Sequence, residues 1–330
     1  MKYLVTGGCG FIGSNFILRC FDKEKDVKIT NIDAMHAGSN PLNLKNLRNP
    51  NYQFIKGNIC DKKLMKKLIE DVDFVINFAA ESHVDRSIKN PEPFIQSNVI
   101  GVYTILELLR TKRKVKFLQI STDEVYGEIL KGKFLECDKL NPSNPYSATK
   151  ASAEMLIRCY TRTYNLDTIV TRSTNNYGPR QFPEKLIPKT IISALRNEAI
   201  PLHGDGRAKR QWMHVFDHCD ALLKILSKWK KSSIYNISGN YEITNLSLVR
   251  QILKIMNKSE NLITFVPDRP GQDERYGINS NLIKREIGFK TKMKPQESLE
   301  STVQWYVSNK EWWQNIRFKK IKNPIPWISN

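Results

Sequence analysis

Short apolar runs alternate with longer amphipathic runs through the first half of the chain. The apolar runs KYLVT, KITNI, YQFIKG, DFVINFA and KFLQIS begin at residues 2, 28, 52, 73 and 116. Amphipathic stretches follow four of them, over residues 11–22, 61–70, 92–111 and 145–164. This alternation is typical of βαβ units around a parallel sheet. Because runs such as FVINFA are apolar at nearly every position, they predict strands that are buried on both faces. We therefore predict a doubly wound α/β fold.

The second half of the chain has shorter periodic segments. From NNYGPRQFPEKLIP, which begins at residue 175, Pro and Gly become more frequent. Helical periodicity returns over residues 183–196, 216–229, 246–256 and 295–308. A chain of 330 residues is long enough for two domains, since single cores tend to split beyond about 250–300 residues. We predict one domain over residues 1–174 and a smaller mixed α/β domain over residues 175–330, with segments of the second crossing back to the first.

The chain is strongly basic, with 52 Lys and Arg against 33 Asp and Glu and a formal net charge of +19. Most of this charge is spread along the whole sequence. The dense clusters TKRKVK at 111–116 and RFKKIK at 317–322 lack the interleaved aromatic residues of a single-strand binder. We therefore expect no specific nucleic-acid partner. The surplus fits either a compositional bias or an attraction for an anionic small substrate.

Three further patterns bear on compartment and metals. No apolar run approaches the ~18 residues of a membrane span, and the N-terminus enters KYLVTGGCG without a secretion signal. The six cysteines include no CxxC pair and fit reduced thiols better than disulfides or a zinc site. His214 and His218 are four residues apart, but no HExxH motif supports a metal site there. We expect a cytoplasmic protein that starts at Met1 and binds neither a membrane nor a metal.

A glycine-rich segment, VTGGCGFIGS, follows the first predicted strand and enters the first predicted helix. Gly7, Gly10 and Gly13 are spaced three residues apart, and Gly8, Gly10 and Gly13 make the literal GxGxxG. A tight turn with positive φ, close approach of backbone N–H groups to a pyrophosphate and close helix packing all call for glycine here. The helix N-terminus favours anions. The segment predicts a dinucleotide site of the Rossmann type; the alternative is a purely structural turn.

Asp33 ends the second predicted strand, twenty residues after Gly13. An acid at this place can accept hydrogen bonds from the adenosine ribose hydroxyls of NAD. The following residues, AMHAG, include no arginine to hold a 2′-phosphate. We therefore expect NAD rather than NADP; without the glycines, an acid that simply ends a strand would be the preferred interpretation.

The segment YSATK places Tyr146 and Lys150 on one side of a predicted helix. A lysine near a phenol stabilises phenolate and lowers its pKa, which suits a base that takes a proton from a sugar hydroxyl. YQFIK at 52–56 and YVSNK at 306–310 match the same pattern, but the first is a predicted strand and the second ends the last predicted helix. Tyr146 is therefore the candidate base.

With these residues in place, the chain resembles the extended short-chain dehydrogenase/reductases. Within them it is similar to the nucleoside-diphosphate-glucose 4,6-dehydratases, which make 4-keto-6-deoxy sugars. The resemblance spans nearly the whole chain, through GGCGFIGS, FAAESHVDRSI, STDEVYGE, NPYSATKASAE, TRSTNNYGPRQFPEKLIP, HGDG, DRPGQDERY and PQESLESTVQWYV. It implies NAD as cofactor and dTDP-glucose or UDP-glucose as substrate.

The resemblance gives a meaning to the two adjacent acids in STDEVYGE. In the implied mechanism Tyr146 takes the 4-hydroxyl proton while NAD+ accepts hydride from C4. Glu124 removes the C5 proton, Asp123 protonates the departing 6-hydroxyl, and hydride returns to C6. Neighbouring carboxyls tend to have their pKa values pushed apart, which agrees with one acid and one base. On a regular strand Thr122 and Glu124 would face one side and Asp123 the other, so we expect the chain to turn there.

The resemblance also implies binding residues. Cofactor contacts are implied for Gly7, Gly10, Phe11, Ile12, Gly13, Asp33, Asn58, Ile59, Ala79, Ala80, Ser97, Tyr146, Lys150 and Asn176. Substrate contacts are implied for Ser82, Thr122, Asn175, Lys185, Leu186, His203, Arg210 and Asn245. This chain departs from the family pattern at Asn58, Gln211, His214 and Gln272. The ending SNKEWWQN resembles the UDP-glucose-acting relatives, but it is a tail and not a base pocket.

Two further expectations complete the sequence analysis. The segments FIQSNVIGVYTILELLR and YSATKASAEMLIRCYTRTY carry more apolar surface than one sheet face needs, and the resemblance implies that they pair into a four-helix bundle in a homodimer. The alternative is two fully buried crossover helices.

Two rival functions remain. One is a nucleotide-sugar epimerase or decarboxylase, which the Asp123–Glu124 pair disfavours. The other is a non-catalytic NAD-bound protein, which the presence of Tyr146 and Lys150 disfavours.

Overall fold

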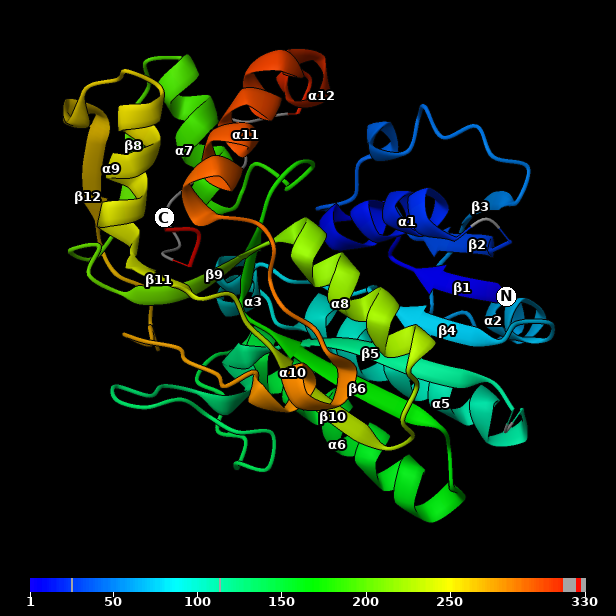
Figure 1. Ribbon diagram of the computed structural model, residues 1–330. Coiled ribbons are helices and arrows are strands. Elements are labelled where there is room, and N and C mark those ends of the chain that lie inside the picture. Colours follow the sequence, from blue (N-terminus) through cyan, green and yellow to red (C-terminus); the bar gives the residue numbers. More distant parts are fainter. Residues whose placement is uncertain (25, 113, 317–324, 328–330) are drawn as a thin grey trace.

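A seven-stranded parallel sheet runs through the first part of the molecule, as a computed structural model shows (Figure 1). The structure describes residues 1–24, 26–112, 114–316 and 325–327. In spatial order the strands are β10 (Ser233–Ile237), β6 (Thr168–Ser173), β5 (Lys116–Thr122), β4 (Phe74–Asn77), β1 (Lys2–Thr6), β2 (Lys28–Asp33) and β3 (Tyr52–Lys56). The strand order reverses between β1 and β4, the point at which ligands bind in open α/β sheets. The predicted doubly wound fold is confirmed.

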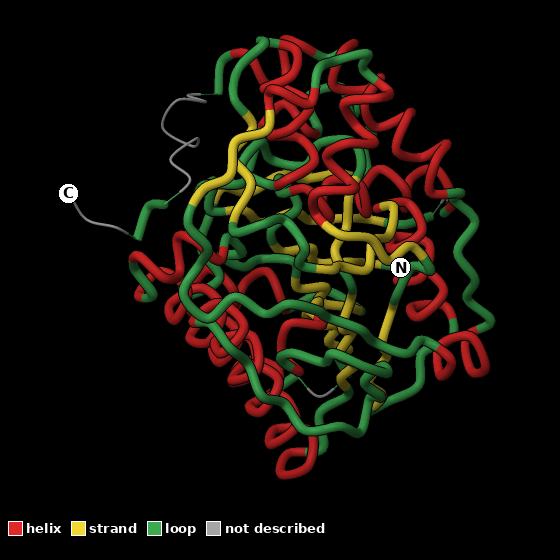
Figure 2. Tube along the Cα trace, turned by 90° about the vertical axis from the view of Figure 1, so that its left-hand side faces the viewer, coloured by secondary structure: helices red, strands yellow, loops and turns green. Residues whose placement is uncertain are grey.

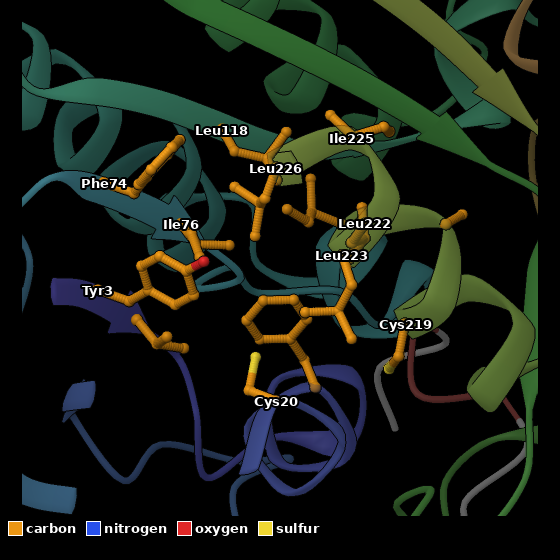
Figure 3. Close-up of a cluster of buried hydrophobic side chains, with 14 of the residues drawn as sticks. Tyr3, Cys20, Phe74, Ile76, Leu118, Cys219, Leu222, Leu223, Ile225 and Leu226 are labelled. Carbon is orange, nitrogen blue, oxygen red and sulfur yellow. The ribbon is translucent and has the colours of Figure 1, made fainter. Parts of the chain in front are cut away.

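Helices cover both faces of this sheet, and alternate strand residues explain why. Tyr3 and Val5 of β1 join one buried apolar cluster, whereas Leu4 between them joins another. The first face carries α1 (Phe11–Lys23), α8 (Val215–Ser227) and α10 (Asn281–Ile287). The second carries α2 (Lys62–Ile69), α5 (Gly101–Thr111) and α6 (Pro145–Tyr164). Figure 3 shows the first cluster, with Leu222 and Leu226 of α8 facing Phe74 and Ile76 of β4.

Two segments from the second half of the chain belong to this sheet layer. Strand β10 pairs in parallel with β6, with Ile234 opposite Val170. Helix α8 packs beside α1, and Arg19 of α1 forms an ion pair with Asp220 of α8 at 2.8 Å. The chain therefore crosses back to the first layer after residue 214. The division into domains at residue 174 stays a prediction.

The remainder of the second half forms a smaller mixed layer. One sheet contains β11 (Tyr241–Thr244), β9 (Lys209–His214) and β7 (Asn175–Tyr177), and another contains β12 (Ile263–Val266) and β8 (Ile200–His203). They pack with α7 (Leu186–Leu195), α9 (Asn245–Ile255), α11 (Pro295–Ser308) and α12 (Lys310–Gln314). Figure 2 shows the strands in the middle of the molecule with helices on two sides. Short 3-10 turns lie at Pro41–Asn43 and Glu260–Leu262.

One predicted helix differs in the structure. The segment 92–111 is divided into α4 (Glu92–Phe94), a π-helical turn (Ile95–Ile100) and α5. Within the π turn the Asn98 side chain is buried, accepting from the Glu81 N–H at 2.9 Å and donating to the Glu81 carbonyl at 3.0 Å. This widened turn tethers the helix to the loop after β4, a contact that helical periodicity cannot predict.

The remaining sequence expectations can be placed only within the described residues. No helix among them is long and apolar enough to cross a bilayer. All six cysteines are free thiols. Among these same residues no group of three or more His, Cys, Asp or Glu side chains is arranged to hold a metal. The basic cluster at 317–322 lies outside the described residues.

Candidate active site

One pocket follows the carboxyl ends of the large sheet and continues into the smaller layer. Every predicted site residue except Asp123 lines it. The predicted cofactor residues on its wall are Gly7, Gly10, Phe11, Ile12, Gly13, Asp33, Asn58, Ile59, Ala79, Ala80, Ser97, Tyr146, Lys150 and Asn176. The predicted substrate residues there are Ser82, Thr122, Asn175, Lys185, Leu186, His203, Arg210 and Asn245, and Glu124 joins them. Residues far apart in the chain are thus brought to one wall.

The glycine turn forms one end of this pocket. Gly7 has a φ of +70°, and a Cβ there would lie 2.6 Å from the Ala79 backbone nitrogen. A Cβ on Gly13 would lie 2.5 Å from the Gly7 carbonyl oxygen. Gly10 caps α1 without any side-chain hydrogen bond, and a Cβ added to it would meet only the Gly7 oxygen, at 3.2 Å. The N–H groups of the first helical turn therefore face an open cradle that fits a pyrophosphate.

Asp33 stands beside the turn at the end of β2 and is 5% exposed. Its carboxylate accepts hydrogen bonds from the Cys9 N–H at 2.9 Å, the Met35 N–H at 2.8 Å and the Ser39 hydroxyl at 2.8 Å. These donors fix the carboxylate at the pocket wall, and each oxygen keeps further acceptor capacity. The arrangement fits a pair of ribose hydroxyls.

The acid–base turn, Asp123–Tyr126, is a 3-10 helix that follows β5 directly. Thr122 caps this turn by accepting a hydrogen bond from the Glu124 N–H at 3.3 Å. The expected turn is therefore present, and it aims Glu124 into the pocket. Asp123 lies behind the wall, 2% exposed, and accepts a hydrogen bond from the Thr122 hydroxyl at 3.3 Å.

Burial raises the pKa values of both acids, Asp123 and Glu124. Burial, followed by the Glu124 charge, raises the pKa of Asp123 to about 8. Burial also raises the pKa of Glu124, against the opposing effect of Lys185 and Arg210. Asp123 is therefore protonated at neutral pH, as a general acid requires.

Helix α6 brings Tyr146 and Lys150 to the same wall. A capping box between Asn144 and Ser147 starts the helix, with Pro145 in its first turn. The Lys150 ammonium donates to the Ile120 carbonyl at 2.6 Å, and burial lowers its pKa to about 8. The lowering of the phenol pKa by Lys150 stays a prediction. Burial, with the Glu124 and Asp123 charges, raises the pKa of Tyr146 well above its ordinary value, and only the Thr122 side chain opposes this.

The far end of the pocket holds a charged cluster that sequence analysis missed in part. The far-end cluster consists of His83, Asp85, Lys185, Lys189, His203 and Arg269. Asp85 is 1% exposed and forms an ion pair with the Arg269 guanidinium, whose Nη2 lies 3.4 Å from Oδ2. His83 and His203 each place Nε2 3.9 Å from the same oxygen.

The far-end cluster carries positive charge toward the pocket. Burial lowers the pKa of both histidines, so both are neutral at pH 7. Burial alone would raise the pKa of Asp85, but the Arg269 charge, with a further contribution from Lys189, holds that pKa below the ordinary value. Three cations, Lys185, Lys189 and Arg269, thus lie around the buried Asp85 carboxylate, and the Glu184 carboxylate acts on the two lysines. The cations of this cluster suit a diphosphate.

Arg210 adds a fixed guanidinium between the acid–base turn and this cluster. It donates to the Lys209 and Asp273 carbonyls, both at 2.8 Å, and its guanidinium lies 4.3 Å from the centre of the Tyr276 ring. A guanidinium anchored in this way presents its remaining N–H groups in a set direction. No single-sequence signal reveals Asp85 or Lys189, because the cluster forms only where α3 (Val84–Lys89), α7, β8 and the loop after β12 meet.

The two histidines of HVFDH, His214 and His218, are buried in the protein. His214 caps α8 by accepting from the Phe216 N–H at 3.3 Å. Burial lowers the pKa of His214 to about 4 and that of His218 to about 3. Both are therefore neutral core residues.

Comparisons with known proteins agree with this geometry. The family model of GDP-mannose 4,6 dehydratase matches residues 4–302. The low-salt glycan biosynthesis protein Agl12 of Haloferax volcanii is 46% identical, covering 94% of this chain and all of the relative. A dTDP-glucose 4,6-dehydratase of Streptomyces niveus is 40% identical over 96% of each chain. A crystal structure of dTDP-glucose 4,6-dehydratase from Bacillus anthracis in complex with NAD superimposes with a TM-score of 0.90 at 44% identity, covering 95% of this chain and 99% of that one. The chain therefore belongs to the GDP-mannose 4,6 dehydratase family.

Proposed function

We propose that the protein is an NAD-dependent nucleoside-diphosphate-glucose 4,6-dehydratase. The observation that carries this proposal is the acid–base turn. It places Glu124 on the same pocket wall as Tyr146, with Asp123 directly behind that wall and hydrogen-bonded to the pocket-lining Thr122. Removal of water needs both an acid and a base, whereas epimerisation at C4 needs neither of these two carboxyls. The names of the similar proteins agree with this choice.

NAD is the proposed cofactor, and the glycine turn and Asp33 are the residues that would hold it. The absence of a Cβ at Gly10 leaves room for a pyrophosphate beside the first turn of α1. When bound, NAD supplies the hydride acceptor and donor of the cycle. A similar protein of known structure contains NAD, which supports the same assignment here.

The proposed roles of the protein groups follow their surroundings. Tyr146 takes the proton of the sugar 4-hydroxyl, and the Thr122 side chain favours its ionisation against the effect of burial. Glu124 removes the C5 proton once a ketone at C4 has made that proton acidic. Asp123 delivers the proton that the departing 6-hydroxyl needs, with the Thr122 hydroxyl between it and the pocket.

The substrate class is proposed from the far-end cluster. Its cations, Lys185, Lys189 and Arg269, and the anchored Arg210 suit the diphosphate of dTDP-glucose or UDP-glucose. Purified protein incubated with each nucleotide sugar should give a product lighter by one water. A product of unchanged mass would favour an epimerase, and binding without any turnover would favour a non-catalytic NAD-bound protein. A 100-fold preference in kcat/KM between the two sugars would identify the base and corresponds to about 2.7 kcal/mol.

We further propose a homodimer through the 95–111 segment and α6. Ile95, Ile100, Tyr103 and Met155 on these helices are 45%, 40%, 44% and 49% exposed, an unusual density of large apolar side chains on one pair of helices. Light scattering should give twice the chain mass at micromolar concentration, and Tyr103→Asp should shift it toward the monomer. A wild-type monomer at that concentration would contradict the proposal.

A cytoplasmic location is proposed on the free thiols. Cys60, Cys137 and Cys159 are partly or fully exposed and unpaired, which suits a reducing compartment. Fractionation of the native cells would test it.

A further inference from the structure

A fully buried ion pair lies beneath the acid–base turn and outside the pocket. Glu154 of α6 is 0% exposed and Arg172 of β6 is 1% exposed. The Arg172 Nη2 and Nε atoms lie 2.6 Å and 2.9 Å from the same Glu154 oxygen, Oε2. Neither side chain lines the pocket, and the proposed reaction gives neither of them a role.

The ion pair reaches both ends of the acid–base turn. The Ser121 hydroxyl, one residue before Thr122, donates to Glu154 Oε1 at 2.5 Å. The Arg172 Nη1 atom donates at 2.5 Å to the hydroxyl of Tyr126, the last residue of the turn. The Tyr126 hydroxyl in turn donates to the Asn236 side chain of β10 at 2.9 Å. The turn is therefore held at its start and at its end by one network.

The same network reaches the helix that carries the candidate base. Glu154 lies one helical turn after Lys150, and its charge raises the pKa of Lys150 against the effect of burial. Buried ion pairs add little net stability relative to well-packed apolar residues of similar size. A buried pair that spans α6, β6 and the acid–base turn instead fixes how these elements sit relative to one another.

We propose that Glu154 and Arg172 are positioning residues that hold the acid–base turn in place against helix α6. The catalytic consequence rests on the proposed dehydratase function, whereas the positioning itself does not. Arg172 contacts the turn through its hydrogen bond to the Tyr126 hydroxyl.

Tyr126→Phe removes this hydrogen bond and keeps the aromatic ring in place. Because misplacement of reacting groups by about 1 Å can cost about 100-fold, kcat should fall about 10- to 100-fold while KM stays within about twofold. Tyr235→Phe is the matched control, since Tyr235 is equally buried on β10 and its hydroxyl bonds Glu286, away from the turn. Amide hydrogen exchange at residues 123–127 should accelerate in Tyr126→Phe and stay unchanged in Tyr235→Phe.

The double variant Glu154→Gln/Arg172→Gln removes the pair without leaving one buried charge alone. In this variant kcat should fall about 10- to 100-fold while KM stays within about twofold, and amide hydrogen exchange at residues 123–127 should accelerate. A purely structural role would lower thermal stability and leave both kcat and the exchange at 123–127 unchanged. Should the double variant fail to fold, Tyr126→Phe decides the matter.

The exchange measurement separates this proposal from the proposed function. Unchanged exchange at 123–127 in Tyr126→Phe, or an equal change in Tyr235→Phe, would overturn the positioning role. An active wild type whose Tyr126→Phe variant keeps its kcat would overturn it as well. A wild type inactive on every nucleotide sugar would refute the dehydratase function, and the exchange data would still decide whether the network positions the turn.

Discussion

The two ends of the pocket present positive potential in different ways. At the glycine end, backbone N–H groups of the first turn of α1 face the cradle, with no basic side chain on the turn itself. At the far end, Lys185, Lys189 and Arg269 supply full charges, and a buried carboxylate holds one of them. Backbone donors cannot titrate, but they need space. Side-chain cations can adjust when a neighbouring residue changes size. Their charge, however, depends on pH, and their position depends on the carboxylate that pairs with them. Substitutions at the two ends should therefore fail in different ways.

The largest effect is expected for Gly13→Ala at the glycine end. The added Cβ would lie 2.5 Å from the Gly7 carbonyl oxygen and 2.9 Å from the Gly8 Cα, both backbone atoms, so the turn must move. NAD affinity, measured by calorimetry, should fall about 100-fold or more, which corresponds to about 2.7 kcal/mol. Gly132→Ala lies outside the pocket and controls for a strained glycine substitution as such, because φ is +79° there and an added Cβ would meet only the Ile129 side chain, at 4.0 Å. Unchanged NAD affinity in Gly13→Ala would show that the cradle is not the cofactor site.

Asp85→Asn should have the next largest effect, at the far end only. The substitution keeps the shape of the side chain but removes the charge that holds Arg269. Hydrogen bonds to charged groups contribute about 1.5–3 kcal/mol, so KM for the nucleotide sugar should rise about 10- to 100-fold. NAD affinity and kcat should change little. An equal loss of NAD affinity would mean that the two ends are not independent.

Asp33→Ala should weaken NAD binding about tenfold through loss of the ribose contact. The Cys9, Met35 and Ser39 donors would also lose their acceptor, so the variant should be compared with wild type at a temperature where both are folded. The nucleoside diphosphate should bind both proteins equally. Tighter binding of NADP than NAD to the wild type would remove the stated role of Asp33.

The smallest expected effect is a change with pH in the affinity of the far end for a nucleoside diphosphate. Burial lowers the pKa of Lys189 to about 8, so its charge is present below that pH and is lost above it. The affinity for a nucleoside diphosphate should therefore fall a few-fold between about pH 7 and pH 9. Direct binding is the right measurement, since Asp123 and Lys150 also have pKa values near 8 and would affect turnover.

Lys189→Met should flatten this pH dependence while leaving NAD binding unchanged over the same range. A slope that survives in Lys189→Met would assign the titration to another group. A loss of pH dependence for NAD in Lys189→Met would contradict the independence of the two ends, since any slope for NAD in the wild type belongs to the cofactor contact Lys150, whose pKa is about 8.

Local patterns account for the parts of the molecule that sequence analysis predicted. The strand and helix alternation, the Gly7 turn and the shared helix face of Tyr146 and Lys150 each depend on residues close together in the chain. The resemblance added most of the substrate residues, several of which lie within its motifs, such as Ser82, Asn175 and Lys185. Asp85 and Arg269 are 184 residues apart, and no local pattern says that they meet. Such pairs depend on how finished elements pack, which a single sequence does not reveal.

The pKa of the Tyr146 phenol could not be predicted from the sequence for a related reason. The spacing of Tyr146 and Lys150 predicts that they share a helix face, and they line one pocket wall. Burial, however, is set by all the elements packed around them, and it raises the pKa of Tyr146, while Lys150 bonds the Ile120 carbonyl. The π turn at Ile95–Ile100 likewise depends on the partners of Asn98 rather than on its own periodicity.

The most direct test of the dehydration chemistry follows two hydrogens of the sugar. Substrate deuterated at C4 is converted in ordinary water, and unlabelled substrate is converted in deuterated water. The wild type should carry the C4 label to C6 of the same molecule and take solvent deuterium at C5. Glu124→Gln should lose C5 exchange, whereas Asp123→Asn should keep part of it and lose water more slowly, with either change costing about 10²–10⁴-fold. A C4 epimer that retains its 6-hydroxyl would contradict the assignment of Asp123 and Glu124 as the dehydrating pair.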